Sequence, residues 1–413
     1  MEKGLRPEGR ECRTGDDRKL REFIVKPQEA GLRLDRYLFR ILDRASKGFV
    51  YKMMRKKNIV LNGRKADGNE ILQENDQVRI YFSEETFWKF STWDIRAEGE
   101  ACLQREGGER QGTAFAAGLK NPDSVPVPGE GGASPENSGA AEKTGGKMKT
   151  IAADTGRRNS GAGIPEAPMP EILYEDEDIL VLSKPAGMLS QKASAGDYSA
   201  NDFVIDYLLE SGQLCEQDLV TFRPSICNRL DRNTSGLLIA GKTTRGLQRI
   251  NGQLRDRSVR KFYHCLVLGE LAEEGLREGY LCKDEKTNTV RVSADPDELC
   301  RENSHTSGGK AVSRIETAWK PLKAENGMTF LEVHLITGKT HQIRAQLAAE
   351  GHPILGDPKY GDREANRKLK REFGVDAQLL HACRMEFPEG TVFSAPDPEI
   401  FSRVFREFSF QKK

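Results

Sequence analysis

The stretch RPSICNRLDRNTSGLLIAGKT, residues 223–243, combines a charged turn with a strongly apolar run. Within it, Asp231 lies between Arg229 and Arg232, and the turn that follows leads into the apolar residues 237–240. Loops braced by a rigid strand often carry catalytic residues, and a carboxylate flanked by guanidinium groups stays ionised at neutral pH. The stretch therefore predicts a buried strand and, in the loop just before it, a nucleophile or base, Asp231. A solvated Arg-Asp-Arg turn would have the same composition.

The letters NRLDRNTSGLL at residues 228–238 resemble the HRLDxxTSG signature of the RluA-type pseudouridine synthases. The resemblance implies that Asp231 is the essential catalytic residue. It also implies that Arg229, Arg232 and Thr234 contact an RNA substrate. One letter departs from the pattern, because Asn228 stands where the family usually has His.

Three further elements resemble this family and occur in its order: Lys-Pro-x-Gly at 184–187, Lys-x-Tyr at 261–263, and KTHQIRAQL at 339–347. The last resembles the family's GRxHQIRxH motif, with Lys339 and Gln346 as departures. The resemblance implies that Arg344 pairs with the catalytic carboxylate. We expect Tyr263 to stack on the flipped-out uracil and later to take the proton from its C5. The resemblance assigns further substrate contacts to Lys184, Lys261 and Ile343. Taken alone, Arg344 could be a surface helix residue and Tyr263 an ordinary buried strand tyrosine.

The composition limits the class of protein. The 413 residues suffice for two or three domains, and 37% hydrophobic with 31% charged residues are typical of a soluble protein. No window approaches the roughly 20 apolar residues of a membrane span, and the charged N-terminus is unlike a signal peptide, which predicts a cytoplasmic location. The eight cysteines include no CxxC pair, which argues against zinc and against a disulfide framework. We expect no metal, no nucleotide or other cofactor, and a monomeric chain.

The N-terminal residues 18–90 contain a strongly basic segment. Eleven basic residues lie in positions 33–65 against two acidic ones, a net charge of +9. A solvated helix face would mix both signs, so one dominant sign predicts an RNA-binding surface. The helical spacing and short strand-like runs of this segment resemble the S4-type RNA-binding domain. The residues expected to contact RNA are Lys47, Lys52, Arg55, Lys56 and Lys57.

The remaining segments complete an α+β organisation. Residues 97–168 are rich in Gly, Ala, Ser, Pro and Glu and predict a flexible linker. Residues 171–408 alternate strand and helix patterns and resemble the synthase core, which implies a mixed, mainly antiparallel sheet with a central cleft. Within this region, residues 281–310 are polar and predict a loop beside the core, and Thr340 is placed to cap a helix.

The resemblance implies isomerisation of uridine to pseudouridine in RNA, with Asp231 attacking the sugar or removing a ribose proton. The target base must leave its stack to reach a carboxylate in a cleft. An S4-like domain favours ribosomal large-subunit RNA, the branch of the RluC and RluD enzymes, over transfer RNA. Two other functions fit the sequence: a glycoside-type hydrolase that pairs Asp231 with Asp357, and a catalytically silent RNA-binding protein.

Overall fold

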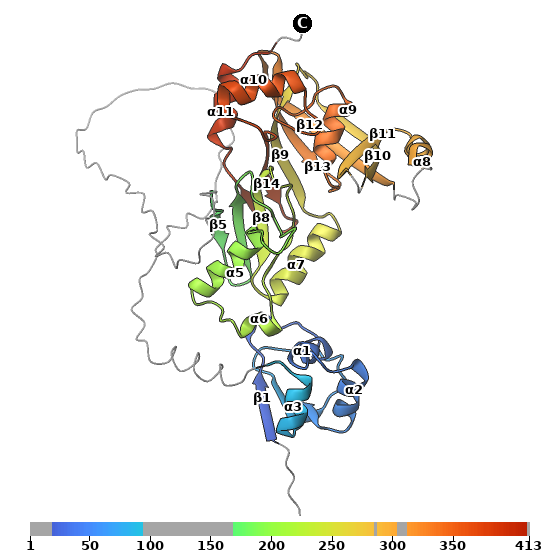
Figure 1. Cartoon of the computed structure of the whole chain (residues 1–413), viewed down its shortest axis with the longest axis vertical. Helices are drawn as coiled ribbons and strands as arrows, with labels where there is room; N and C mark the ends of the chain where they lie inside the picture. The colour runs from blue at the N-terminus through green and yellow to red at the C-terminus, as the bar shows by residue number, and fades with distance from the viewer. Residues whose placement is uncertain (1–18, 94–167, 285–286, 304–311, 411–413) are drawn as a thin grey trace, which may run out of the picture. The chain divides into compact units, whose positions relative to one another are not determined.

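The computed structural model describes residues 19–93, 168–284, 287–303 and 312–410 (Figure 1). The predicted linker at 97–168 lies outside the described residues except for its last position. Two sheets organise the described chain, one of four strands and one of eleven. Among the described helices, none has both the length and the apolar composition needed to cross a bilayer.

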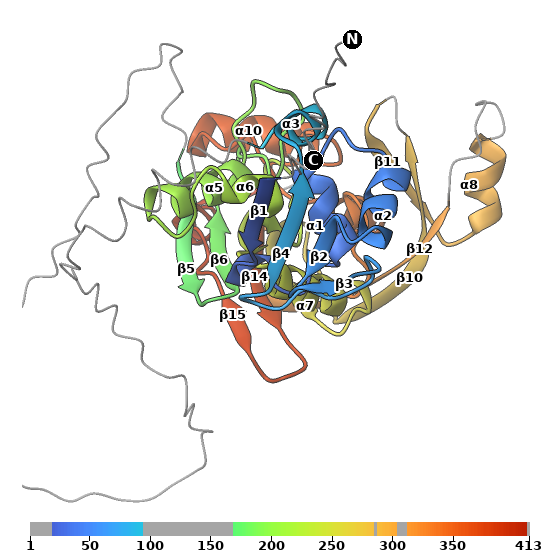
Figure 2. The same ribbon diagram turned by 90° about the horizontal axis from the view of Figure 1, so that it is seen from below.

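The N-terminal part consists of a small antiparallel sheet and short helices with their own core. The strands follow the order β1 (Lys19–Ile24), β4 (Gln77–Phe82), β2 (Ile59–Leu61) and β3 (Arg64–Lys65), side by side in Figure 2. Helices α1 (Leu34–Ile41) and α2 (Lys47–Arg55) contribute Leu34, Leu38, Val50 and Met54 to one core with Ile80. The helical spacing in this part corresponds to α1 and α2, and its strand-like runs correspond to β2 and β4. The structure adds β1 and α3 (Glu84–Phe90), which the sequence patterns did not indicate.

The larger sheet is mixed but mainly antiparallel, which confirms the predicted α+β class. Its main path begins with β11 (Thr289–Ser293), β10 (Gly275–Asp284), β12 (Ser313–Glu325), β13 (Met328–Leu335) and β9 (Arg260–Leu268). It continues with β14 (Leu380–Glu386), β8 (Ser235–Gly241), β6 (Ile179–Lys184) and β5 (Glu171–Glu175). Strand β7 (Ser225–Ile226) pairs with β8, and β15 (Val392–Ser394) with β14. Among these pairings, β14 with β8 is parallel.

Hydrophobic pattern and packing explain the main strands. All seven residues of β8 are buried, as its apolar run predicts for a central strand. Strand β13 alternates buried and half-buried residues, which is the period of a strand with one covered face. Around this sheet lie α5 (Ala200–Glu210), α6 (Asp218–Thr221), α7 (Thr244–Arg255) and α9 (Gln342–Ala349) (Figure 1). Helices α10 (Arg363–Phe373) and α11 (Glu399–Glu407) share a core with β9 and β13.

The predicted loop at 281–310 is wrong over most of its described length. Strand β10 continues to Asp284, β11 pairs with it, and α8 (Pro296–Asn303) follows. Strand β11 forms the edge of the sheet, so many side chains of this hairpin face water and its sequence is polar. Helix α10 was not predicted either. Its ends carry typical helix signals, because Asp362 caps the first turn and Gly374 ends the helix at a φ of 71°.

Candidate active site

A cleft of about 760 Å³ lies where the loop before β8, the beginning of β9 and the N-terminus of α9 meet. This volume falls in the range of ligand pockets, roughly 300–1,000 Å³. Eight Lys or Arg side chains line it, and among the described lining residues Asp231 is the single carboxylate. The basic lining residues are Lys192, Arg229, Arg232, Lys261, Lys283, Lys339, Arg344 and Lys359. A cleft of this charge attracts an anionic ligand and directs it to one carboxylate.

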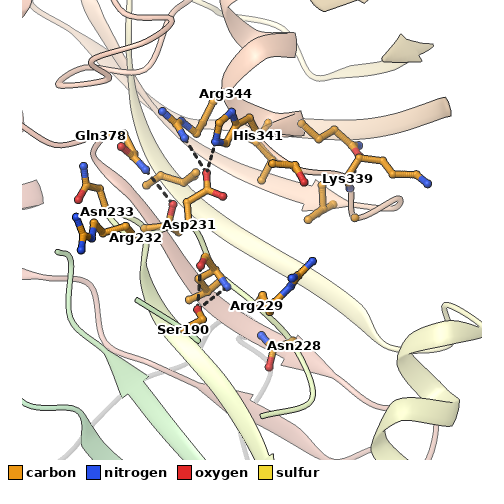
Figure 3. Close-up of a pocket in the computed structure, with 18 of the residues that line it drawn as sticks. Ser190, Asn228, Arg229, Asp231, Arg232, Asn233, Lys339, His341, Arg344 and Gln378 are labelled. Atoms are coloured by element: carbon orange, nitrogen blue, oxygen red, sulfur yellow. Dashed lines mark hydrogen bonds and ion pairs between the residues drawn. The ribbon is translucent and has the colours of Figure 1, made fainter. Parts of the chain in front are cut away.

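The Asp231 loop is held from both sides by hydrogen bonds. The Ser190 hydroxyl donates to the Leu230 carbonyl at 2.8 Å and accepts from the Leu230 N–H at 3.0 Å (Figure 3). The Gln378 amide donates to the Thr234 hydroxyl at 3.2 Å. Gly236, the second residue of β8, has a φ of +106° and lies so close to β14 that a Cβ there would collide with the Ala382 backbone. These contacts fix the Asp231 carboxylate on a rigid support.

Arg344 connects Asp231 to a second, buried carboxylate. Its Nη1 donates to Asp231 Oδ2 at 2.8 Å, and its Nε and Nη2 donate to the two oxygens of Asp357 at 2.7 and 2.9 Å. The Asp231 side chain is 27% exposed, whereas that of Asp357 is 0% exposed. Asp357 therefore fixes the orientation of Arg344. Arg344 presents one N–H to Asp231, which is still partly exposed (Figure 3).

Asp357 orients Arg344 and is not available as a second catalytic carboxylate. Burial alone would raise the pKa of the Asp357 carboxyl, but the hydrogen bonds and charge of Arg344 outweigh burial and hold this pKa below its usual value. The backbone N–H groups of Lys359 and Tyr360 also donate to Asp357 Oδ1. A paired-carboxylate hydrolase needs one carboxyl that stays protonated to act as an acid. The geometry therefore disfavours the hydrolase hypothesis.

His341 is a cleft residue whose role the sequence patterns did not indicate. It precedes α9 as its N-cap at a left-handed φ of 55°, so the predicted cap at Thr340 is wrong by one position. The Tyr360 hydroxyl accepts from the Val290 N–H at 2.8 Å and forms a second hydrogen bond with His341 Nδ1 at 2.9 Å. Nε2 of His341 faces Asp231 Oδ2 at 3.9 Å. Burial lowers the pKa of His341, which keeps the ring neutral at pH 7.

Lys184, which the resemblance assigns to substrate contact, has a fully buried side chain that lies outside the cleft lining. This position indicates a supporting role in the loop. Its ammonium group donates to the carbonyls of Pro185, Met188 and Arg232 at 2.9, 2.9 and 3.0 Å. Arg232 directly follows Asp231, so Lys184 anchors the catalytic loop from behind. Burial lowers the pKa of Lys184 to about 7, although the charge of Asp231 acts in the opposite direction.

We expect the Lys184→Met variant to lose a pH dependence of stability that the parent has. The folded-state pKa of about 7 lies below the unfolded value of about 10.4. The unfolded chain therefore binds more protons across this window, and this lysine makes stability rise from about pH 7 to about pH 10, by at most about 1.4 kcal/mol per pH unit. Urea unfolding of parent and variant at pH 7 and pH 9.5 measures the effect. A constant difference between the two proteins would contradict it.

Tyr263, Lys261 and Ile343 line the cleft, as predicted for substrate-contacting residues. The Tyr263 ring is largely buried, and within the described residues its hydroxyl has no hydrogen-bond partner. Burial, followed by the charge of Asp231, raises the pKa of Tyr263, so the phenol stays protonated at neutral pH. Burial and then the charge of Arg257 lower the pKa of Lys261.

Arg229 and Arg232 line the cleft but do not hold Asp231. Both side chains are exposed, and in Figure 3 they extend away from the carboxylate. Among the described residues, the hydrogen bond that orients Asp231 comes from Arg344 instead. The guanidinium groups of Arg229 and Arg232 remain accessible to a ligand.

The departures from the family pattern have local structural explanations. The Asn228 amide donates to the Leu237 carbonyl at 3.1 Å and accepts from the Ile239 N–H at 2.9 Å, so it satisfies the backbone of β8. Gln346 is buried, accepts from the Thr317 hydroxyl at 2.6 Å and donates to the Arg277 carbonyl at 3.2 Å. Lys339 lies at the exposed rim of the cleft. None of these three side chains is hydrogen-bonded to Asp231 or Arg344 in the described structure.

The five basic residues predicted to contact RNA from the N-terminal part all have exposed side chains. Lys47, Lys52 and Arg55 lie on α2, Lys56 follows the helix, and Lys57 adopts a φ of 59°. None of the five belongs to the lining of the cleft that contains Asp231. The basic surface on α2 is defined by the exposed side chains of Lys47, Lys52 and Arg55.

Comparison with known proteins matches the part of the chain that contains Asp231 and Arg344. The family model described as RNA pseudouridylate synthase matches residues 178–349. Ribosomal large subunit pseudouridine synthase D of Zymomonas mobilis is 33% identical over 220 residues, which cover 52% of this chain and 64% of that protein. Ribosomal large subunit pseudouridine synthase C of Vibrio cholerae is 30% identical over 217 residues, 52% of this chain and 60% of that protein.

A third relative is matched over more of its length. An uncharacterized RNA pseudouridine synthase of Aquifex aeolicus is 30% identical over 241 residues, which cover 57% of this chain and 71% of that protein. The chain thus spans less than two thirds of the two ribosomal large subunit relatives but more than two thirds of this one.

Proposed function

Because the chain belongs to the RNA pseudouridylate synthase family, we propose that it isomerises uridine to pseudouridine in RNA. In this reaction the bond between N1 of uracil and C1′ of ribose breaks, the base rotates, and a bond forms between C5 and C1′. The proton on C5 leaves and N1 gains one, so no oxidant, reductant or water is consumed. The observation that carries the proposal is the partly exposed Asp231 carboxylate, oriented by Arg344 in a basic cleft.

Asp231 is the catalytic residue of this proposal. One of its oxygens accepts from Arg344, and the partial exposure of the side chain leaves it accessible to a ribose that enters the cleft. It attacks the sugar or removes a ribose proton, and the hydrogen bond from Arg344 orients the carboxylate for either role. The uridine has to leave its stack to arrive there.

Tyr263 supports the flipped base in this proposal. Its ring lines the same cleft as Asp231, and a flat aromatic face can stack on uracil. Because burial and Asp231 raise the pKa of its hydroxyl, a free phenolate that could take the C5 proton is scarce at neutral pH. We therefore assign Tyr263 to stacking and to hydrogen-bond donation.

We propose ribosomal large-subunit RNA as the substrate, with transfer RNA as the alternative. Two relatives at 30% and 33% identity carry names of ribosomal large subunit synthases. The basic surface on α2 suits a large folded RNA, and we infer that residues 18–90 act as an S4-like RNA-binding domain. Residues 171–408 then form the catalytic domain, joined to it by a linker at 97–168.

Pseudouridine mapping in cells with and without this protein tests the proposal. We expect one or a few positions in large-subunit ribosomal RNA to lose the modification when the gene is deleted. Expression of the parent should restore them, and expression of Asp231→Asn should not. Loss confined to transfer RNA would establish the alternative substrate, and an unchanged map in both RNA classes would contradict the proposed function.

The basic surface on α2 predicts a specific salt dependence of RNA binding. We expect the double variant Lys52→Gln, Arg55→Gln to bind RNA more weakly, with the slope of log K against log [salt] reduced by about 1.4–1.8 for two lost phosphate contacts. Lys320→Gln, Lys323→Gln on exposed β12 positions removes the same charge and serves as the control. Equal slopes for the α2 double variant and the parent would show that this surface does not bind RNA.

A further inference from the structure

A cluster of potential metal ligands lies on three adjacent strands. His264 belongs to β9, Glu332 is its cross-strand partner on β13, and Cys383 belongs to β14 on the other side of β9. Cys383 is the extra residue of an irregularity in the β14–β9 register, which leaves it outside the regular pairing. Successive strand residues point to opposite faces, so His264 lies on the face opposite to Tyr263. The cluster is therefore separate from the cleft that contains Asp231.

The distances within the cluster suit a bound ion. One potential ligand atom from each of His264, Glu332 and Cys383 lies within 4.8 Å of the other two. Nε2 of His264 is 3.8 Å from Glu332 Oε2, too far for a direct hydrogen bond. Two ligand atoms on a tetrahedral zinc ion, each about 2.0–2.3 Å from the metal, are roughly 3.3–3.7 Å apart. Small side-chain movements would close this geometry.

A fourth residue orients the histidine. Nδ1 of His264 lies 2.7 and 2.9 Å from the two oxygens of Asp397. Nδ1 therefore carries the proton in the neutral ring, and Nε2 is left with a free lone pair on the side of Glu332. A carboxylate that accepts from the non-ligating nitrogen is the usual partner of a zinc-bound histidine. The side chains of His264 and Glu332 are 18% and 20% exposed, so an ion can enter from solvent.

The ligand types favour zinc over magnesium and calcium. Imidazole nitrogen, carboxylate oxygen and thiolate sulfur are the three donors that Zn²⁺ accepts in proteins, whereas Mg²⁺ and Ca²⁺ require oxygen. The alternative reading is an ion-pair network, in which a protonated His264 lies between Asp397 and Glu332. In this structure Arg384 also donates to Glu332 at 2.9 Å. The network accounts for the charged groups, whereas the Cys383 thiol takes no part in it and donates only a weak hydrogen bond to the Phe262 carbonyl at 3.4 Å.

We propose that His264 Nε2, the Glu332 carboxylate and the Cys383 thiolate form a Zn²⁺ site, with Asp397 holding the histidine and water completing the tetrahedron. Binding transfers the thiol proton of Cys383 to solvent and moves Glu332 from Arg384 to the metal. The ion would join β13, β9 and β14 directly behind Tyr263. It thereby stabilises the part of the sheet that carries one wall of the cleft.

The test is metal binding by the full chain after removal of bound metal with a chelator. Cobalt(II) replaces zinc as the probe, because a thiolate ligand gives it an intense near-ultraviolet charge-transfer band. We expect the parent to bind one Co²⁺ with this band and to lose the band when Zn²⁺ is added. His264→Ala should lose binding, and Cys383→Ser should lose the band. Asp397→Asn should keep the band at saturation but bind about 10- to 100-fold more weakly.

Two further variants keep the test decisive. Cys215→Ser changes a free thiol outside the cluster and should bind like the parent. Glu332→Gln changes a half-buried side chain rather than a buried one, so it can replace a variant that fails to fold, and it should also weaken binding. A parent without the band, or a band that survives both His264→Ala and Cys383→Ser, would overturn the site. The assay contains no RNA, so its outcome is independent of the proposed reaction.

Discussion

Replacement of Asp231 by asparagine is expected to abolish pseudouridine formation, with a rate roughly 10⁴-fold or more below the parent, the upper range for loss of one acid–base group. The asparagine oxygen can still accept from Arg344 Nη1, which holds the parent carboxylate at 2.8 Å. The loop and the fold should therefore persist, and RNA affinity should change little. Single-turnover conversion of a short uridine-containing RNA measures the rate.

The control is Asp256→Asn, which changes an exposed carboxylate outside the cleft lining and should leave activity unchanged. Circular dichroism and RNA binding establish that both variants are folded. Turnover by Asp231→Asn within tenfold of the parent would refute the assignment of Asp231 as catalytic residue.

Arg344→Met is expected to reduce both activity and stability. Activity should fall by orders of magnitude, because Asp231 loses the hydrogen bond that orients it. The free energy of unfolding should fall by about 3–5 kcal/mol, because Asp357 is left as a buried carboxylate without its cation. Arg344→Lys should recover only part of both, since one ammonium group cannot contact Asp231 and both oxygens of Asp357 in the same geometry.

The stability loss in Arg344→Met should depend on pH in a defined direction. In the parent the pKa of Asp357 is below its usual value, so its contribution to stability is present above the unfolded pKa and is lost as pH falls through the folded pKa. In the variant, burial without Arg344 raises the pKa of Asp357. The loss in the free energy of unfolding is then complete above the raised pKa. It disappears below the pKa of the unfolded state, about 3.9. Urea unfolding at pH 7 and pH 4 checks this, and an equal difference at both would show that Asp357 is not stranded.

The resemblance of two separated motifs was sufficient to predict the central pair of the site. Asp231 and Arg344 lie on different elements, and the structure joins them by one hydrogen bond. The alternation in 328–335 and the apolar run at 237–240 likewise correspond to real strands, because each pattern reports the burial of a face.

The features that the sequence did not indicate depend on tertiary contacts or on solvent-facing edges. In the sequence, Lys184 is an ordinary basic residue. It is buried and hydrogen-bonded to the Asp231 loop only because β6 packs against that loop. Asp357 becomes an orienting partner because the chain after α9 returns to Arg344. The β10–β11 hairpin has too few apolar residues for a strand signal, since one side of it is the sheet edge. The His264 cluster draws on three strands, so it has no local spacing to detect.

The most direct test of the proposed isomerisation uses RNA labelled with tritium at C5 of uracil. A pseudouridine synthase must release this tritium to water, since C5 forms the new bond to C1′. We expect one tritium released per pseudouridine formed, no free uracil, and no release by Asp231→Asn. Free uracil from the labelled RNA would indicate a hydrolase, and no release from RNA that the protein binds would indicate a silent RNA-binding protein. Either result would contradict the proposed isomerisation.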